Sequence, residues 1–335
     1  RVAGRSINFN VTDIQLGDTP IPYFSYQTPR TFHVEQLPCF ITRTTPATRD
    51  TITRNLHLSP LYSGRIEGVG PRYCPSIEDK FVKFAEKEAH QIFIEPEGRS
   101  TDEYYINGAS TSLPEEVQTN LIRSIVGLER AEIIRPAYAV EYDYSLPHQL
   151  HQTLESKLIR GLFFAGQING TSGYEEAAAQ GLIAGINAAL WGTNKKLILT
   201  RANSYIGVLI DDLITKSTDE PYRMFTSRAE YRLQLRQDNA DIRLTPSGKD
   251  VGLVSNTRWQ SFIHRKSLVD AEMERLNRAR VSGKTLAELL RQPEMKYEGL
   301  PGARLNLPDS VRQEVEIQVK YSGYIARDLR SEEHT

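Results

Sequence analysis

The spacing of hydrophobic residues divides the chain into strand-like and helix-like stretches. Residues 1 to about 72 hold short apolar runs broken by prolines, such as 32–34 and 39–42, and this pattern predicts a β-rich region. Residues 91–94 continue with a strand-like run. Apolar residues then recur three to four positions apart over 114–128, which predicts a helix.

The order of elements in the middle of the chain predicts a nucleotide-binding sheet. An apolar strand is expected over residues 161–165, followed by a glycine-rich turn and a helix of small residues over 175–190. Strand, glycine turn and helix in this order are typical of a doubly wound sheet. The fold class predicted from this pattern is α/β.

The C-terminal third has a different pattern. Residues 222–235 and 259–280 are arginine-rich and amphipathic, and shorter apolar stretches follow at 286–290 and 311–324, so a helical domain is expected after about residue 200. Residues 315–325 also alternate apolar and polar side chains, and periodicity alone leaves them open between strand and helix.

Composition limits the class of protein. The chain has 335 residues, 39% of them hydrophobic, which is enough for more than one compact core. It contains neither the roughly 18-residue apolar window of a membrane span nor a secretory signal at its start, so we expect no membrane association and a cytoplasmic or organelle-matrix location. The net charge of −1 means that any nucleic-acid binding must rest on a local basic surface.

The glycine-rich turn is the first candidate site. The residues that we expect to hold a ligand there are Gly166, Gln167, Asn169, Gly170 and Thr171. Glycines let the backbone approach a ligand, and the following helix directs its N-terminal amides at a pyrophosphate or at the electron-rich edge of a flavin. An ordinary closely packed strand-to-helix turn fits the same residues, and the pattern leaves both interpretations open.

The segment around Cys74 is the second candidate. Arg72 and Lys80 supply positive charge that favours a thiolate, and such a thiol could add to C6 of a pyrimidine or donate a proton beside a flavin. A small buried hydrophobic residue is the alternative role for Cys74. The other cysteine, Cys39, lies in an apolar run and is expected in the core. Both are expected as free thiols.

The third candidate is an arginine-rich segment. Arg228, Arg232 and Arg236 share one face if residues 222–235 are helical, and together with Arg223 they could grip the phosphates of an RNA. The residues alone favour a solvated face in which Glu230 and Asp238 neutralise these arginines. The seven histidines have no metal-ligand spacing, so no metal is predicted.

Long motifs in this chain resemble the MnmG (GidA) family. They are PRYCPSIEDK at 71–80, FAGQINGT at 164–171, YEEAA at 174–178, YRMFTSRAEYRL at 222–233 and EIQVKY at 316–321. The resemblance covers nearly the whole chain and keeps the motifs in one order. It implies a flavin-dependent enzyme that modifies uridine 34 of tRNA, adding a carboxymethylaminomethyl or related aminomethyl group at C5.

The family also implies cofactors and partners. FAD is the redox centre, NADH reduces it, and methylenetetrahydrofolate supplies carbon. The protein is expected as a homodimer that binds tRNA and joins the GTPase MnmE in a two-plus-two heterotetramer. The family is cytoplasmic in bacteria, and its eukaryotic homologue is mitochondrial.

Family roles carry over to particular positions of this sequence. Cys74 matches a functionally important cysteine, and the glycine-rich turn matches an FAD contact. A segment associated with the nicotinamide cofactor matches Gly70, Pro71, Arg72, Tyr73, Pro75, Ser76, Ile77, Glu78, Asp79, Lys80 and Phe84. Arg223, Arg228 and Arg232 fit a role in positioning tRNA.

The full prediction is part of a doubly wound FAD-binding, Rossmann-like sheet with an inserted β-rich domain and a helical C-terminal domain. The expected regions are 1–80 for the inserted, nicotinamide-associated part, 81–198 for the second half of the FAD domain, and 199–335 for a linker and a shortened helical domain. Two other functions remain open, a folate- and FAD-dependent methyltransferase of tRNA uridine 54 and a non-catalytic flavin- or tRNA-binding scaffold.

The sequence also departs from the family pattern. The N-terminal GxGxxG motif and the first important cysteine are absent, and the chain opens on Arg1 without a methionine. We therefore expect a C-terminal two-thirds fragment that is inactive on its own.

Overall fold

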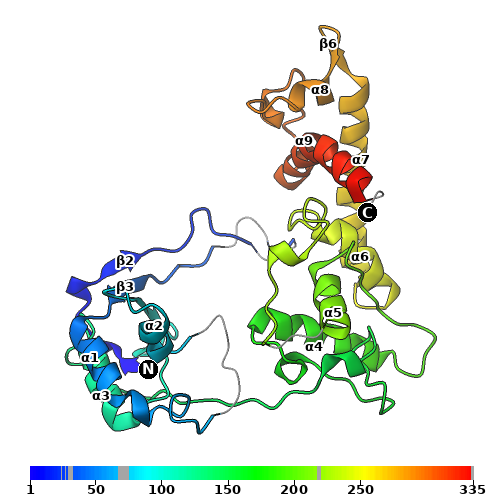
Figure 1. Ribbon diagram of the computed structural model, residues 1–335. Coiled ribbons are helices and arrows are strands. Elements are labelled where there is room, and N and C mark those ends of the chain that lie inside the picture. The colour runs from blue at the N-terminus through cyan, green and yellow to red at the C-terminus, as the bar shows by residue number, and fades with distance from the viewer. Residues whose placement is uncertain (24, 27, 29–32, 67–74, 217–219, 333–335) are drawn as a thin grey trace. The chain divides into compact units, whose positions relative to one another are not determined.

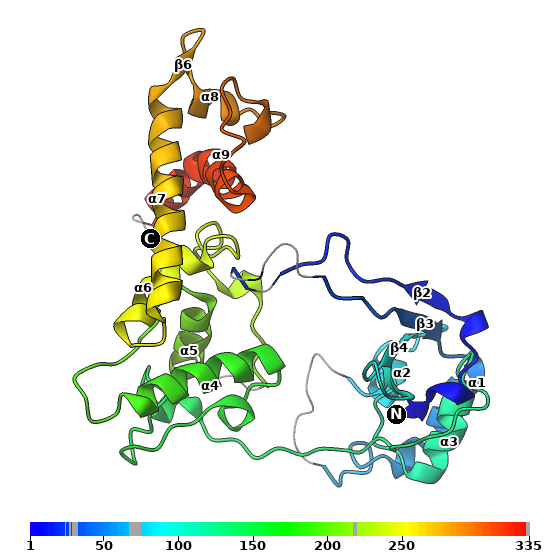
Figure 2. The ribbon, with the colours of Figure 1, turned by 180° about the vertical axis from the view of Figure 1, so that it is seen from behind.

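The computed structural model is α/β and divides into two compact units, Arg1–Asp143 and Tyr144–Thr335, each described here by itself (Figures 1 and 2). It describes all residues except 24, 27, 29–32, 67–74, 217–219 and 333–335. In the last helix it describes the side chains only as far as residue 327. The predicted boundary at residue 80 falls inside the first unit, and the boundary at residue 198 falls inside the second.

The first unit is built on a five-stranded sheet. Its strands are β1 (Val2–Ala3), β2 (Asp13–Gln15), β3 (Cys39–Arg43), β4 (Gln91–Pro96) and β5 (Glu103–Asn107), in the order β1-β5-β4-β3-β2. Every neighbouring pair is antiparallel, with Phe40 opposite Ile94 and Ile94 opposite Ile106. The strand predicted over 39–42 is confirmed. Of the run 32–34, Phe32 lies outside the described residues and the other two are not in a strand.

Three helices cover the core of this unit. They are α1 (Pro46–Asn55), α2 (Ile77–Lys83) and α3 (Glu115–Arg123). Thr45 and Thr48 form a capping box at the start of α1, where Pro46 occupies a position that needs no N–H donor. Ile52, Phe81, Ile92 and Leu121 meet in one buried cluster, because alternate residues of β4 and one side of each helix are apolar.

The second unit begins with an irregular region and two central helices. The helix predicted over 175–190 is confirmed as α4 (Tyr174–Ala189), and α5 (Tyr205–Thr215) packs against it. Residues 161–165, predicted as a strand, form only an isolated bridge between Phe163 and Glu155. A parallel strand needs parallel neighbours to satisfy its backbone groups, and no strand among the described residues pairs with this one in that way.

The C-terminal region is helical, as predicted. It contains α6 (Ala240–Asp250), α7 (Asn256–Arg278), α8 (Leu286–Leu290) and α9 (Asp309–Glu332), with a small hairpin of β6 (Arg280–Val281) and β7 (Lys284–Thr285). In Figure 1, α7 runs from α6 towards this hairpin. Both α8 and α9 pack against α7. Val269, Leu290, Val311 and Val315 lie in the shared core of α7, α8 and α9. Residues 315–325, which periodicity left open, belong to the helix α9.

Candidate functional site

The glycine-rich turn lies directly before α4. Residues Gly166–Asn169 form a single 3-10 turn, and Gly170 follows it. Gly166 and Gly170 adopt φ angles of +84° and +75°, a left-handed conformation that glycine accepts at little cost. These two glycines let the chain turn before it enters α4 at Tyr174.

Gln180 of α4 holds this turn in place. Its Oε1 accepts hydrogen bonds from Gly166 N at 3.2 Å and from Asn169 Nδ2 at 2.8 Å, and its Nε2 donates to Thr171 Oγ1 at 3.0 Å. The Gln180 side chain is 0% exposed, so these bonds are shielded from water. One side chain thus fixes both ends of the turn on the helix that follows.

Two buried acceptors beside the turn have no hydrogen-bond partner among the described residues. They are Asn169 Oδ1 and Glu176 Oε2, whose residues are 0% and 3% exposed. The N-cap of α4 is Gly173, which has no side chain to cap the first amides. Such a site suits a ligand that offers both hydrogen-bond donors and acceptors.

The arginine segment, residues 222–236, is attached to the turn. Thr171 and Tyr222 form a parallel bridge in which Tyr222 N donates to Gly170 O at 2.8 Å. Met224 N donates to Glu176 Oε1 at 2.7 Å. The Tyr222 side chain is buried and its hydroxyl donates to Asp212 at 2.9 Å. The turn, α4, α5 and the arginine segment therefore form one local structure.

The prediction of a helix over 222–235 is wrong. The segment contains only the short 3-10 turn Thr226–Arg228 and is otherwise irregular. Its arginines donate to nearby carbonyls instead of lining one helical face: Arg228 Nε bonds Arg223 O at 2.8 Å, and Arg232 Nε bonds Ala229 O at 3.1 Å. Pairing with the turn and burial of Tyr222 impose an extended start that a helix could not adopt.

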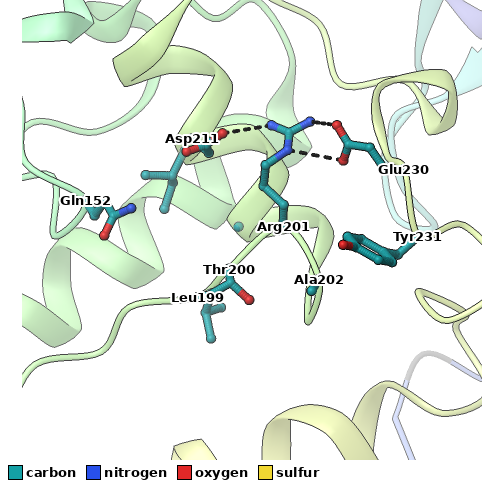
Figure 3. Close-up of a pocket in the computed structure, with 10 residues that line it drawn as sticks. Gln152, Leu199, Thr200, Arg201, Ala202, Asp211, Glu230 and Tyr231 are labelled. Atoms are coloured by element: carbon teal, nitrogen blue, oxygen red, sulfur yellow. Dashed lines mark hydrogen bonds and ion pairs between the residues drawn. The ribbon is translucent and has the colours of Figure 1, made fainter. Parts of the chain in front are cut away.

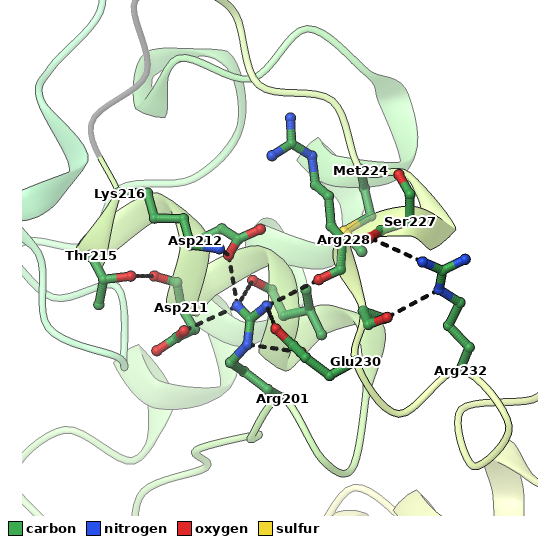
Figure 4. A network of polar contacts seen from close by, with 12 residues as sticks. Arg201, Asp211, Asp212, Thr215, Lys216, Met224, Ser227, Arg228, Glu230 and Arg232 are labelled. Carbon is green, nitrogen blue, oxygen red and sulfur yellow. Dashed lines mark hydrogen bonds and ion pairs between the residues drawn. The ribbon is translucent and has the colours of Figure 1, made fainter. Parts of the chain in front are cut away.

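The charges in this segment match the predicted salt-bridged face only in part. Asp238 pairs with Arg236, as predicted, whereas Glu230 pairs with Arg201. In the described part of the chain, neither Arg228 nor Arg232 has a carboxylate within ion-pair distance (Figure 4). The Arg228 guanidinium lies 4.4 Å from the centre of the Tyr222 ring. Two arginines are thus oriented by carbonyl and aromatic contacts, and no described carboxylate compensates their positive charge.

Arg223 differs from its two neighbours. Its Nε lies 3.3 Å from Glu176 Oε1, in an ion pair with a carboxylate that is almost fully buried. A buried carboxylate needs a cation or hydrogen bonds nearby, so Arg223 serves first to neutralise Glu176. Of the three arginines predicted to bind RNA, Arg228 and Arg232 offer the stronger positive charge.

The family described as "Glucose inhibited division protein A" matches residues 1–196, more than half of the chain, and the "tRNA modifying enzyme MnmG/GidA C-terminal helical domain" matches residues 256–329. The chain belongs to the GidA family. The resemblance found in the sequence motifs is therefore confirmed.

Curated GidA-family relatives resemble the chain along nearly all of its length. Two are described as "tRNA uridine 5-carboxymethylaminomethyl modification enzyme MnmG", from Caldicellulosiruptor saccharolyticus at 53% identity and from Geobacillus thermodenitrificans at 51%. The matches cover 98% and 99% of this chain, and 56% of each relative. The chain therefore spans little more than half the length of the relatives it matches.

Solved GidA structures have the same fold. Two crystal forms of Aquifex aeolicus GidA superpose with TM-scores of 0.87 and 0.88, at 46% and 48% identity. Each match covers 99% of this chain and 56% or 57% of the Aquifex chain. At this identity, the order and packing of elements described above are those of the family.

The predicted nicotinamide segment lies partly outside the described residues, which exclude Gly70, Pro71, Arg72, Tyr73 and Cys74. The described part, Pro75 to Phe84, contains α2, which Ser76 caps through a bond from Asp79 N. Ile77 and Glu78 are fully buried.

The polar side chains of α2 make specific contacts. Lys80 Nζ donates to Gly108 O at 2.9 Å, and Glu78 Oε1 accepts from the backbone and hydroxyl of Ser112. The other oxygen of Glu78, Oε2, is buried with no hydrogen-bond partner among the described residues. Phe84 ends the helix half exposed. Ile77 therefore anchors the segment, and the roles of the other residues toward a cofactor stay a prediction.

Beside the arginine segment lies an open hollow of about 460 Å³ (Figure 3). Gln152, Thr200 and Tyr231 line it together with Arg201, Asp211 and Glu230. Hydrogen bonds from Arg201 hold the pKa of Glu230 below its ordinary value. The charged wall of the hollow is thus internally paired.

Sequence reasoning missed Gln180 and Arg201. Each acts through partners that are distant in the sequence, as with Thr171 and Gln180, which are 9 positions apart, or Arg201 and Glu230, which are 29 apart. Cys39 was expected in the core, but it is half buried on β3. Burial and, after it, the charge of Glu95 raise the pKa of its thiol.

No described group of three or more His, Cys, Asp or Glu side chains could hold a metal. No described helix is long and apolar enough to cross a membrane.

Proposed function

We propose that the full-length protein modifies uridine 34 of tRNA, adding a carboxymethylaminomethyl or related aminomethyl group at C5. The curated relatives named for this reaction match 98% or more of the chain. The observation that carries the proposal is the state of Arg228 and Arg232, which have no carboxylate partner among the described residues and are oriented by backbone carbonyls. Uncompensated, oriented guanidinium groups suit the phosphates of RNA.

FAD is the cofactor that fits the glycine-rich turn. Gly166, Gly170 and Thr171 would let its edge approach the backbone, and Gln167 and Asn169 would contact it. The buried Asn169 Oδ1 needs a donor, and the uncapped start of α4 favours an electron-rich group. When bound, FAD supplies the redox chemistry of the modification. The chain's own part is to orient the cofactor and to keep water from it.

The segment at 70–84 carries further proposed roles, argued from the family resemblance. Cys74 would act on the uracil, as a nucleophile at C6 or as the acid that returns a proton during exchange at C5. NADH, which this segment is predicted to contact, would reduce the flavin, and methylenetetrahydrofolate would donate the carbon. We further propose a homodimer that works in the cytoplasm with the GTPase MnmE in a two-plus-two assembly.

The carrying observation is tested by tRNA binding. In a full-length protein that carries this chain, Arg228→Ala and Arg232→Ala should each weaken binding of a tRNA transcript and make the dependence of log Kd on log salt shallower by about one. The exposed Arg130, in the first unit, provides the control variant Arg130→Ala. Unchanged affinity and salt dependence in both test variants would refute a role for these arginines in RNA binding.

A further inference from the structure

Arg201 is the centre of the polar network beneath the arginine segment (Figure 4). Its Nη1 donates to Asp211 at 3.0 Å and to Asp212 at 2.6 Å, and its Nη2 donates to Arg228 O at 3.0 Å. Its Nε and Nη2 hold the two oxygens of Glu230 at 3.1 and 2.6 Å. A guanidinium has five N–H groups, and here all three nitrogens are engaged.

The pairing with Glu230 has a direct electrostatic consequence. Glu230 lies two positions after Arg228 and two before Arg232, and its side chain is 43% exposed. A carboxylate in that place would readily pair with either neighbour and reduce its charge. Arg201 instead binds it with a two-pronged contact, which is stronger and more directional than a single ion pair.

The bond from Arg201 to Arg228 O adds a positional effect. Arg228 directs its own Nε to Arg223 O and its guanidinium over Tyr222. Holding the Arg228 backbone therefore helps to set where its free N–H groups point. Arg201 acts on the charge and on the direction of the same side chain.

We propose that Arg201 is a positioning residue for RNA binding, which sequesters the Glu230 carboxylate and thereby leaves Arg228 and Arg232 available for tRNA phosphates. This inference rests on the proposed function. It assigns to Arg201 no contact with the RNA.

The network suggests that a variant at Arg201 still folds. Asp212, the buried carboxylate of the cluster, also accepts from Lys216 Nζ at 2.6 Å and from Tyr222 Oη at 2.9 Å. Loss of Arg201 would therefore leave Asp212 with two partners. Glu230 and Asp211 have no second ion pair among the described residues, so both carboxylates would be released. Of the two, Glu230 is the one that stands between Arg228 and Arg232 in the chain.

The experiment measures Kd for an unmodified tRNA transcript bearing uridine 34, with full-length protein, at several salt concentrations. Arg201→Gln should weaken binding about tenfold at low salt, and the loss should shrink as salt screens the released carboxylate. Adding Glu230→Gln in the same chain should restore affinity to within about twofold of the wild type. Glu230→Gln alone is the matched control and should bind at least as well as the wild type.

The rescue separates this proposal from a merely structural role. If Arg201→Gln weakens binding and the double variant is no better, Arg201 only supports the fold and the proposal is overturned, as it is if Arg201→Gln binds normally. Should Arg201→Gln not fold, Arg201→Lys, which retains one charge, is expected to show a smaller loss with the same rescue. If Arg228→Ala and Arg232→Ala leave tRNA binding unchanged, it is the proposed function that fails.

Discussion

Single buried side chains organise the candidate site. The Gln180 side chain accepts hydrogen bonds from Gly166 and Asn169. It donates hydrogen bonds to Thr171 and to the Glu176 carbonyl one turn earlier. Because the amide is fully buried, water cannot replace these partners. The shape of the glycine-rich turn therefore depends on one residue outside it.

Replacing Gln180 with leucine should remove the hydrogen bonds that hold the glycine-rich turn and so destabilise the fold. Each buried group left unpaired costs roughly 1–3 kcal/mol, so we expect the free energy of unfolding to fall by at least about 2 kcal/mol. Urea denaturation of full-length protein measures the change. The control Ala178→Leu introduces the same side chain on the exposed side of α4 and should change stability little; equal effects from both variants would contradict the role given to Gln180.

His90 makes the first unit sensitive to mild acid. It is buried against Phe81, and its Nε2 has no hydrogen-bond partner among the described residues. Burial, helped by Lys80, Lys87 and Arg49, lowers the pKa of His90. The unfolded chain, with an ordinary histidine pKa of about 6.5, then binds the proton more readily than the folded one, so stability falls as pH drops below that value.

The variant His90→Gln removes this titration. Its free energy of unfolding should change less than that of the wild type between about pH 7 and pH 5. The exposed His57 gives the matched control His57→Gln, which should keep the wild-type pH dependence. Parallel pH curves for His90→Gln and the wild type would show that protonation of His90 does not destabilise the fold.

The glycine-rich turn and the arginine segment could be located from sequence, but their side-chain partners could not. Glycine spacing and an apolar run are local features, and they correctly marked the turn before α4. Glu230 was expected to neutralise its neighbouring arginines, whereas it pairs with Arg201, 29 positions away. Competition among several possible ion pairs is decided by tertiary geometry, which a linear pattern does not contain.

At the scale of elements, α5 is fixed by a close contact at its first turn. Ser204 caps the helix through a bond from Gly207 N, and a Cβ at Gly207 would overlap the backbone carbonyl of Thr200. Backbone cannot move aside as a flexible side chain can. This contact also places Thr200 and Arg201 against α5, so it supports the polar network.

The variant Gly207→Ala should therefore lower the free energy of unfolding by about 1–3 kcal/mol and weaken tRNA binding with it. Gly185→Ala in α4 is the matched control, because a Cβ there meets nothing within 4 Å. That change should be neutral or stabilise the helix by up to about 1 kcal/mol. Equal stability of the two variants in thermal unfolding would disprove the proposed contact.

Elements with strong periodicity were the most predictable. The helices α4, α7 and α8 begin and end within a few residues of their predicted limits. Two of the wrong predictions, a strand over 161–165 and a helix over 222–235, involve segments whose state depends on neighbours. The first lacks parallel neighbours in the described chain, and the second is drawn into a bridge with Thr171.

At the scale of the whole molecule, the candidate functional segments are divided between the two units, and the family assignment covers both. The segment that precedes and forms α2 belongs to the first unit, and the glycine-rich turn and arginine segment belong to the second. The family matches span both units at 51–53% identity. Since the chain covers 56% of these relatives, experiments on activity require a full-length protein that carries it.

The most direct measurement is mass spectrometry of tRNA nucleosides from a cell that lacks its own family member and receives such a full-length gene. Wild type should restore the C5-modified wobble uridine, Cys74→Ser should not, and Cys39→Ser, at the free thiol on β3, should behave as wild type. Restoration of 5-methyluridine alone, or normal wobble modification with Cys74→Ser, would contradict this account.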